Sequence, residues 1–418
     1  MNPDYVHKFT QKESLPLKKL IWIGCLSYFV IGLAHVVLGS ILPVLLQHYD
    51  RSYSAGGELI FSQFGGFLAG VLVSPLLNRR FGKRGGILIA TGLLVCAETA
   101  YAFLPPWGWM YVIAVAAGFG FGMIEAVIGT IIIAAITEGT AIAMSRLEVL
   151  FGVGALLMPL AASPLIAAGS WRLAFLIVAA FSLVSLLFWA KSSFGPLQGV
   201  LDERPLRTAA AAAFADATAP GTVSVAGKSG RLPYKGKQWV LLGLFIVFFF
   251  LYVGTEMSLV NFMPAIFIAK LGMSEAAAAL TVTFFWLAMS AGRLFAGVVA
   301  ERISYRIYVL LSCFAALLLL VIFPFAEHRI AAFAVILLLG LFMSGIFSIA
   351  LVFASKLLPG AEESTPSIMI ASGGIGGAVL PLLTGWSMDH MQVAQTSGLL
   401  AAFAAVLFLL SVAAWKIG

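Results

Sequence analysis

Long runs of apolar residues recur along most of the chain, and they limit its possible folds more than any other feature. The runs match the roughly 20 apolar residues that a transmembrane helix needs, and they lack the strict alternation of a membrane β-strand. The composition agrees, because 61% of the 418 residues are apolar and 10% are charged, with a mean hydropathy of +1.04. One soluble core cannot bury that much apolar surface. We therefore expect an all-α membrane protein and exclude a soluble enzyme, a nucleic-acid-binding protein and a disordered chain.

The apolar runs form two sets of six, separated by a polar stretch. This stretch, residues 193–236, is rich in Ala, Gly, Ser and Pro and is typical of a flexible linker, which we expect on the cytoplasmic side. The chain is thus expected to consist of an N-terminal six-helix half at 1–192, the linker, and a C-terminal six-helix half at 237–418. The twelve transmembrane helices are expected at 20–47, 55–78, 86–104, 108–136, 142–168, 171–191, 237–269, 274–300, 306–325, 329–358, 365–388 and 394–416.

The basic residues are distributed unevenly over the segments between these helices. With both termini in the cytoplasm, twenty of the 25 Lys and Arg residues lie in cytoplasmic segments, four lie outside, and Arg293 lies within a helix. The positive-inside rule describes this distribution, so the net charge of +7 needs no nucleic-acid partner. The polar, basic first twenty residues lack the features of a cleaved signal peptide. We expect a monomeric, multi-pass protein of the cell membrane with both termini in the cytoplasm.

The two halves repeat one another at a nearly constant offset in sequence number, about 222, which we call the repeat offset. Pro43 in the first helix corresponds to Pro264 in the seventh. Segment 152–159 of the fifth helix, which contains a Gly-x-Gly pair and a Pro, corresponds to segment 374–381 of the eleventh. Parallel repeats of this kind place a substrate site at the midplane between two halves that rock about it. The repeat therefore predicts two pseudo-symmetric halves and a transporter.

The loop after the eighth helix carries a further signal. Residues 297–306 read Gly-Val-Val-Ala-Glu-Arg-Ile-Ser-Tyr-Arg, which resembles the loop signature G-x-L-A-D-R-x-G-R-K of the major facilitator superfamily. The resemblance implies that these charges lock two helices in one access state and release them in the other. The first-half copy departs from the signature, because Arg79 stands at the carboxylate position. Arg293 lies on the same helix face as Gly297 and Glu301. The expected gating residues are Arg293, Glu301, Arg302, Arg79, Lys83 and Arg84.

Ionisable residues inside the expected helices are few, and Glu125 is the strongest candidate among them. A charge at the middle of a bilayer is costly and usually faces a cavity or a partner. Gly118, Gly122 and Gly129 share a helix face with Glu125, so little side-chain bulk surrounds the carboxyl group. We expect a protonatable group beside a substrate cavity. The alternative is a neutral, hydrogen-bonded Glu at a close helix contact.

Further candidates lie in the first, second, fifth, seventh and eighth helices. His35 and Glu256 each precede a Pro by eight positions, so they occupy equivalent positions in the repeat and are candidates for proton coupling. The amides of Gln63 and Asn261 and the ring of Trp286 could bind a hydroxyl-rich ligand through hydrogen bonds and a flat apolar face. Packing explains a lone histidine or tryptophan equally well. Glu148, near the start of the fifth helix, is either a substrate-binding or a gating residue, and Glu98 in the third helix has no assigned role.

Five segments that lie in both halves are FSQFGGFLAGVL, GMIEAVIGT, SRLEVLFGVGAL, VGTEMSLVNFMP and FFWLAMSAGR. They resemble the fucose, galactose and glucose proton symporter branch of the superfamily, and most of all its bacterial glucose/mannose type. The resemblance implies that Glu125 carries the coupled proton near the sugar. Fucose permease also has an Asp in its first helix shortly before a Pro, where this chain has Gly39, so His35 and Glu256 are the candidates for a second proton site.

These patterns favour a secondary active transporter that takes up a hexose with protons by alternating access. The expected partners are the small-molecule substrate, protons and the lipid bilayer. The chain has neither a phosphate-binding loop nor a metal-ligand spacing, so no enzyme activity, cofactor or metal is expected. The alternatives are a proton-coupled antiporter that exports drugs or metabolites, for which the 33 Phe residues argue, and a non-transporting receptor or scaffold.

Overall fold

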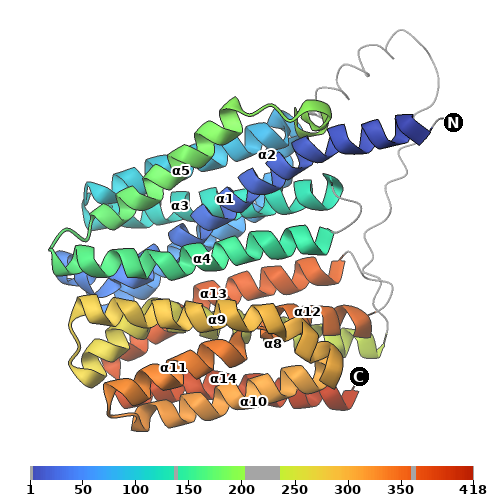
Figure 1. Cartoon of the computed structure of the whole chain (residues 1–418). Coiled ribbons are helices and arrows are strands. Elements are labelled where there is room, and N and C mark those ends of the chain that lie inside the picture. Colours follow the sequence, from blue (N-terminus) through green and yellow to red (C-terminus); the bar gives the residue numbers. More distant parts are fainter. Residues whose placement is uncertain (1–2, 136–139, 203–235, 359–363, 418) are drawn as a thin grey trace, which may run out of the picture.

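The computed structural model describes residues 3–135, 140–202, 236–358 and 364–417. The helices of these ranges lie side by side in one bundle, with both termini at the same end (Figure 1). We call this end the terminal face, and the opposite end, which includes residues 50–52 and 103–106, the distal face. The helices are α1 (Pro3–Tyr49), α2 (Tyr53–Ala102), α3 (Trp107–Ala135), α4 (Thr140–Ala167), α5 (Leu173–Lys191), η1 (Gly195–Leu197), α6 (Gln198–Asp202), α8 (Lys237–Leu271), α9 (Glu275–Ile303), α10 (Tyr305–Ile322), η2 (Phe323–Phe325), α11 (Arg329–Met343), α12 (Ile346–Leu357), α13 (Ser364–His390) and α14 (Val393–Ile417).

The expected all-α membrane fold is confirmed. Eleven helical stretches in the described residues are long and apolar enough to cross a membrane. One of them, α2, contains both the second and the third expected helix. Gly82 forms the break between these two parts, and its φ of 77° favours glycine. The tenth expected helix is divided into α11 and α12 at Ser344 and Gly345. The twelve expected membrane segments thus correspond to the observed helices.

Helix ends repeat between the halves as closely as helix interiors do. Ser52 and Ser274 are related by the repeat offset, and both cap the N-terminus of a helix by accepting a backbone N–H with the side-chain oxygen. Gly82 and Ser304 are related in the same way, and both have a positive φ, 77° and 83°. The turn that separates α9 from α10 is therefore the same turn that breaks α2. In the second half a serine occupies a conformation that suits glycine.

The two halves pack against each other along two main seams. Helices α1–α5 form the upper part of Figure 1 and α8–α14 the lower part. One seam joins α2 to α13, the other joins α4 to α9, and α1 also contacts α8. All six of these helices carry candidate site residues or pack directly against helices that do.

Glycines permit the closest contacts inside each half. A Cβ at Gly154 of α4 would overlap the carbonyl group of Phe29 in α1, and a Cβ at Gly376 of α13 would overlap that of Phe250 in α8. The two glycines are related by the repeat offset and belong to the repeated Gly-x-Gly pairs. These pairs therefore allow two backbones to approach each other, as small residues commonly do in membrane proteins.

The start of the segment predicted as a linker packs against the N-terminal half. Residues 195–202 form η1 and α6, and the side chains of Phe194 and Leu201 are buried. Arg84 donates hydrogen bonds to the carbonyl oxygens of Trp189 (3.0 Å) and Ala190 (2.8 Å) at the end of α5. Residues 203–235 of the predicted linker lie outside the described residues.

Candidate functional site

The centre of the bundle contains His35, enclosed by aromatic rings. Its ring lies edge-on to those of Phe64, Phe121 and Phe151, with centroid distances of 5.4, 5.9 and 5.4 Å. Its Nε2 lies 2.9 Å from the Sδ of Met257 in α8, whereas its Nδ1 has no hydrogen-bond partner among the described residues. Met257 and His35 are related by the repeat offset, so this contact joins equivalent positions of the two halves. His35 thus lies where the pseudo-symmetry axis passes between α1 and α8.

Two amides and an indole near this axis have polar atoms left over. Gln63 donates its Nε2 to the carbonyl oxygen of Ala34 (3.4 Å), and Asn261 donates its Nδ2 to that of Met257 (2.9 Å). Both amide orientations follow, because a carbonyl oxygen can only accept. In the described part of the chain, Oε1 of Gln63, Oδ1 of Asn261 and Nε1 of Trp286 have no hydrogen-bond partner. All three residues are 1% exposed.

Asn261 also lies at the crossing of α1 and α8. A Cβ added to Gly39 would come within 2.8 Å of both the Cα and the Oδ1 of Asn261. The repeat offset relates these two positions as well. The glycine at the position of the missing first-helix carboxylate therefore makes room for the amide on the opposite helix.

Glu125 lies half-buried on α3, on the face that carries the glycines. A Cβ at Gly118 would overlap the carbonyl group of Gln63, and one at Gly122 would approach the carbonyl oxygen of Phe67 to 2.5 Å. The glycines therefore bring α3 against the part of α2 that carries Gln63. Glu125 is close enough to interact electrostatically with Glu148 of α4. The close helix contact is therefore present, and the role of Glu125 as a protonatable group beside a substrate cavity stays a prediction.

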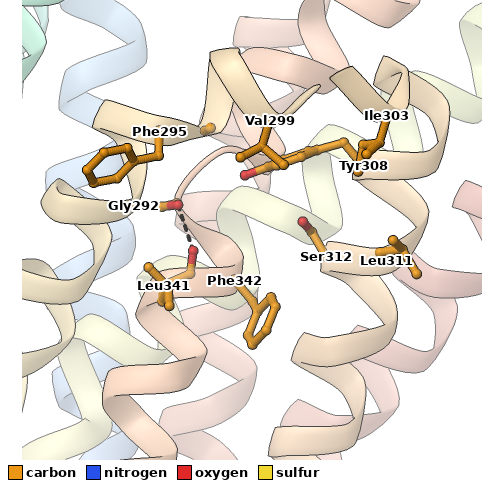
Figure 2. Close-up of a pocket in the computed structure, with 11 residues that line it drawn as sticks. Gly292, Phe295, Val299, Ile303, Tyr308, Leu311, Ser312, Leu341 and Phe342 are labelled. Carbon is orange, nitrogen blue, oxygen red and sulfur yellow. Dashed lines mark hydrogen bonds between the residues drawn. The ribbon is translucent and has the colours of Figure 1, made fainter. Parts of the chain in front are cut away.

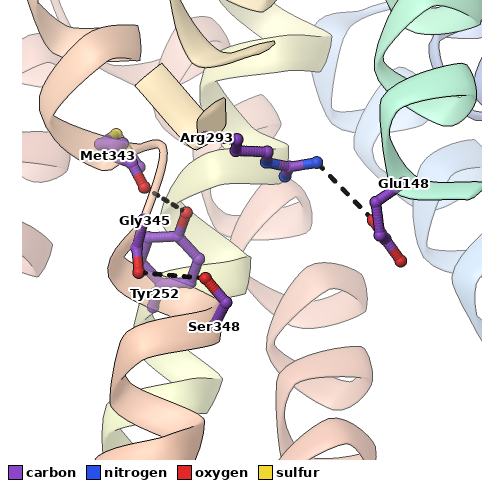
Figure 3. A network of polar contacts seen from close by, with 6 residues as sticks. All are labelled: Glu148, Tyr252, Arg293, Met343, Gly345 and Ser348. Carbon is purple, nitrogen blue, oxygen red and sulfur yellow. Dashed lines mark hydrogen bonds and ion pairs between the residues drawn. The ribbon is translucent and has the colours of Figure 1, made fainter. Parts of the chain in front are cut away.

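Arg293 links the two halves. One of its guanidinium nitrogens, Nη1, lies 3.7 Å from Oε2 of Glu148, so the pair joins α9 to α4 (Figure 3). Its guanidinium carbon is also 5.6 Å from the ring centroid of Trp286, and that ring lies 5.6 Å from the ring of Phe151. Glu148 and Arg293 remain partly exposed, at 50% and 27% of their side chains. Both side chains therefore keep part of their surface free of protein contacts, and the charge pair lies on the seam between α4 and α9.

Glu256 lies near this pair in the C-terminal half. It is 6% exposed on α8 and close enough to interact electrostatically with Arg293. Tyr252, one turn earlier, donates its hydroxyl to the carbonyl oxygen of Met343 (2.9 Å), just before the break between α11 and α12 (Figure 3). The structure thus brings Glu148, Glu256 and His35 around one arginine, and Glu125 joins this cluster through Glu148.

The remaining predicted residues lie apart from this cluster. Arg79, Glu301 and Arg302 are exposed near the terminal face, Lys83 is half-buried, and Arg84 caps α5 as described. Glu98 is fully buried in α2, and neither carboxyl oxygen has a hydrogen-bond partner among the described residues.

A further polar contact joins the two halves at the distal face. Asp389, at the end of α13, accepts hydrogen bonds from the backbone N–H groups of Tyr53 (2.8 Å) and Ser54 (2.6 Å) at the start of α2. The backbones also approach closely here, because a Cβ at Gly385 would lie 2.5 Å from the carbonyl oxygen of Tyr53. A carboxylate at a helix N-terminus is favourable, since it meets free N–H groups and the positive end of the helix dipole.

The fold and the charge contacts correspond to a known family. The sequence matches the Major Facilitator Superfamily over residues 24–265 and 244–417, which together include both halves. The chain belongs to the Major Facilitator Superfamily. It is therefore a membrane transporter and not an enzyme.

Individual relatives agree with the family. The glucose/mannose transporter GlcP of Bacillus subtilis is 31% identical over 93% of this chain and 93% of its own length. A glucose/galactose transporter of Brucella abortus is 32% identical over 34% of this chain and 35% of its own length. The crystal structure of a D-xylose–proton symporter superposes with a TM-score of 0.75, at 17% identity, over 96% of this chain and 97% of that one.

Three residues of the transporter's contacts were missed by sequence reasoning. Met257 could have been found, because the repeat offset leads to it directly from His35. Phe151 belongs to a set of 33 Phe residues, and nothing in the sequence distinguishes it from those that face lipid. Asp389 reads as an ordinary polar residue at the end of a helix, and its partners are backbone groups, which no sequence pattern identifies.

Proposed function

We propose that this transporter takes up an uncharged hexose together with protons by alternating access. The full-length similarity to a glucose/mannose transporter is the observation that carries the proposal. Glu125, His35 and Glu256 are proposed to exchange protons, Gln63, Asn261, Trp286 and Glu148 to bind the sugar, and Arg293 to act as a gate together with Glu301, Arg302, Arg79, Lys83 and Arg84.

The free polar atoms near the axis support a hydroxyl-bearing ligand. Oε1 of Gln63 and Oδ1 of Asn261 can only accept hydrogen bonds, whereas Nε1 of Trp286 can only donate one. A ligand that satisfies all three must both donate and accept, as a hydroxyl group does. A carboxylate or phosphate only accepts, and an ammonium group only donates. A sugar also offers C–H groups to the rings of Phe151 and Trp286, which lie 5.6 Å apart.

The cluster around Arg293 supports coupling to protons. The carboxyl groups of Glu148 and Glu256 share the surroundings of one guanidinium group, and Glu125 in turn interacts with Glu148. Protonation of one carboxyl group changes the net charge that Arg293 meets, and thereby the strength of its contact with Glu148 across the halves. Proton binding is in this way linked to the separation of α4 from α9, as coupling requires a ligand to bind the two states differently.

The proposed orientation has both termini in the cytoplasm of a cell with this protein in its plasma membrane. It rests on the distribution of twenty basic residues on one side and four on the other. A membrane-impermeant thiol reagent on intact cells tests it, in a background without the three native cysteines. A cysteine at Ser52 should be labelled from outside and one at Lys416 should not, and the reverse pattern would overturn the orientation. We further propose that a single chain is the transporting unit. A measurement of the mass of the protein in nanodiscs tests this proposal.

Transport by purified protein in liposomes tests the proposed function. An imposed gradient with an acidic exterior should drive accumulation of radiolabelled glucose or mannose above its external concentration, and a protonophore should abolish it. Gluconate and glucose 6-phosphate at equal concentration should compete more weakly than glucose, because each replaces a hydroxyl group by an anionic group that cannot donate to Oε1 of Gln63 or Oδ1 of Asn261. Hexose uptake that is indifferent to the gradient would remove the coupling, and absence of hexose uptake would remove the substrate class.

Proton-coupled export of apolar compounds remains the second candidate, favoured by the three Phe rings around His35. The same liposomes distinguish the two functions. An exporter would load a cationic dye against a proton gradient of the opposite direction and would leave glucose outside.

A further inference from the structure

A cavity of about 260 Å³ lies between α9, α10 and α11, on the outer side of the C-terminal half (Figure 2). Apolar side chains form most of it, among them Phe295, Val299, Leu311 and Phe342, and all four are exposed on the surface of the protein. It is smaller than the roughly 300–1,000 Å³ of pockets for drug-sized ligands. The size and the apolar lining suit a single hydrocarbon chain.

We call this cavity the groove, and it is about as long as one leaflet of a membrane is thick. It extends along α9 from Gly292 to Ile303, and these two residues are eleven helical steps apart. At 1.5 Å per residue this distance is about 16 Å, close to half of the roughly 30 Å hydrocarbon core. Ile303 is the last residue of α9, so the groove begins at the terminal face and ends near the middle of the membrane.

Basic residues stand at the open end of the groove. Arg302 and Arg306 flank Ile303 at the terminal face, and both are exposed. Lys356 lies nearby, with its Nζ 4.2 Å from the ring centroid of Tyr305. Glu301 is the one acidic side chain of this turn, which leaves an excess of positive charge. Basic groups beside a membrane surface attract anionic lipid head groups.

We propose that the groove between α9, α10 and α11 binds one anionic phospholipid, with an acyl chain between the helices and the head group at Arg302 and Arg306. The length of the groove, its apolar lining and the positive charge at its opening all fit this one occupant. The inner end of the groove reaches Gly292, which adjoins Arg293, and faces Ser344, where α11 breaks. The lipid therefore supports α9 directly behind the charge pair that joins the halves.

Photolabelling in nanodiscs tests the site without any transport assay. A phosphatidylglycerol with a diazirine on one acyl chain is mixed with the full-length protein, illuminated, and the modified residues are located by mass spectrometry. Labels should concentrate on the facing sides of α9, α10 and α11, and unlabelled phosphatidylglycerol should compete better than phosphatidylcholine. Removal of each arginine, as Arg302→Gln or Arg306→Gln, should reduce this preference about fivefold.

Two adjacent valines provide a matched pair of variants. Val299→Trp places a bulky ring in the groove and should reduce labelling there at least about fivefold. Val298→Trp adds the same ring on an exposed side chain that does not line the groove, and should leave labelling unchanged. Labels spread evenly over the outer helices, or equal labelling of both variants, would show ordinary boundary lipid and overturn the proposal. The proposal would also be overturned if the arginine variants lost the preference for phosphatidylglycerol while no labels were found in the groove.

Discussion

Replacing Asp389 with Asn should open the distal face more often. The carboxylate accepts two backbone hydrogen bonds, of 2.8 and 2.6 Å, from the first residues of α2. Hydrogen bonds to a charged group contribute about 1.5–3 kcal/mol each, and a charge at a helix terminus about 0.3–1 kcal/mol. The Asn side chain keeps one acceptor but loses the charge and the second acceptor. Because Asp389 is exposed and solvent weakens such contacts, we expect a loss slightly below this combined range, about 1.5 kcal/mol.

A loss of about 1.5 kcal/mol shifts a two-state equilibrium about tenfold. The shift can be read as the labelling rate of a cysteine at Leu382, which is half-buried where Gly57 packs against it. In a background that lacks Cys25, Cys96 and Cys313, a membrane-impermeant maleimide should react about tenfold faster in the Asp389→Asn variant. This assumes that the distal face opens and closes faster than the reagent reacts.

Asp50→Asn is the matched control, because Asp50 is an exposed carboxylate on the same face. Its φ of 49° is also one that Asn tolerates. Equal labelling of the Leu382→Cys protein with and without the Asp389→Asn change would refute the reasoning, since the contact would then contribute nothing to closure. Faster labelling in both the Asp389 and the Asp50 variants would assign the effect to general surface charge.

Three further outcomes follow from other contacts. Gly118→Ala should destabilise the protein by about 1–3 kcal/mol, because a Cβ there overlaps the carbonyl group of Gln63, whereas Gly65→Ala has free space and should not lower the melting temperature. Arg293→Gln should lose a contact worth at most about 1 kcal/mol in folding, yet reduce proton-driven uptake far more than equilibrium exchange, because its pair with Glu148 is partly exposed and crosses the halves. Asn261→Ala should weaken hexose binding about tenfold or more, which the shift of the melting temperature with added sugar measures. The response of uptake to pH should be the same in this variant as in the unaltered protein.

Much of the fold was accessible from the sequence because it is repeated. Apolar length alone predicts helices, and the repeat offset predicts the two halves. The offset reaches further than the helices, since it also relates the caps Ser52 and Ser274 and the turns at Gly82 and Ser304. Each such pair forms the same local structure at two places in the chain, so two sequence segments indicate it instead of one.

The site was only partly accessible. Rare ionisable residues in apolar helices led to His35, Glu125 and Arg293 because burial of such groups in lipid is costly. Most of their partners were not accessible, because partnership depends on the rotation of whole helices about their axes. The repeat offset leads from His35 to Met257, but the pairing of Arg293 with Glu148 and the capping of α5 by Arg84 within its own half have no such sequence signal.

The central claim, that Glu125 carries the coupled proton, is tested most directly by Glu125→Gln in liposomes. We predict that this variant still exchanges radiolabelled hexose across the membrane at equal concentrations, but no longer accumulates it when the exterior is acidic. Glu98→Gln, which changes a buried carboxyl group away from the cluster, should accumulate hexose like the unaltered protein. Accumulation by the Glu125→Gln variant at the unaltered level would contradict the account.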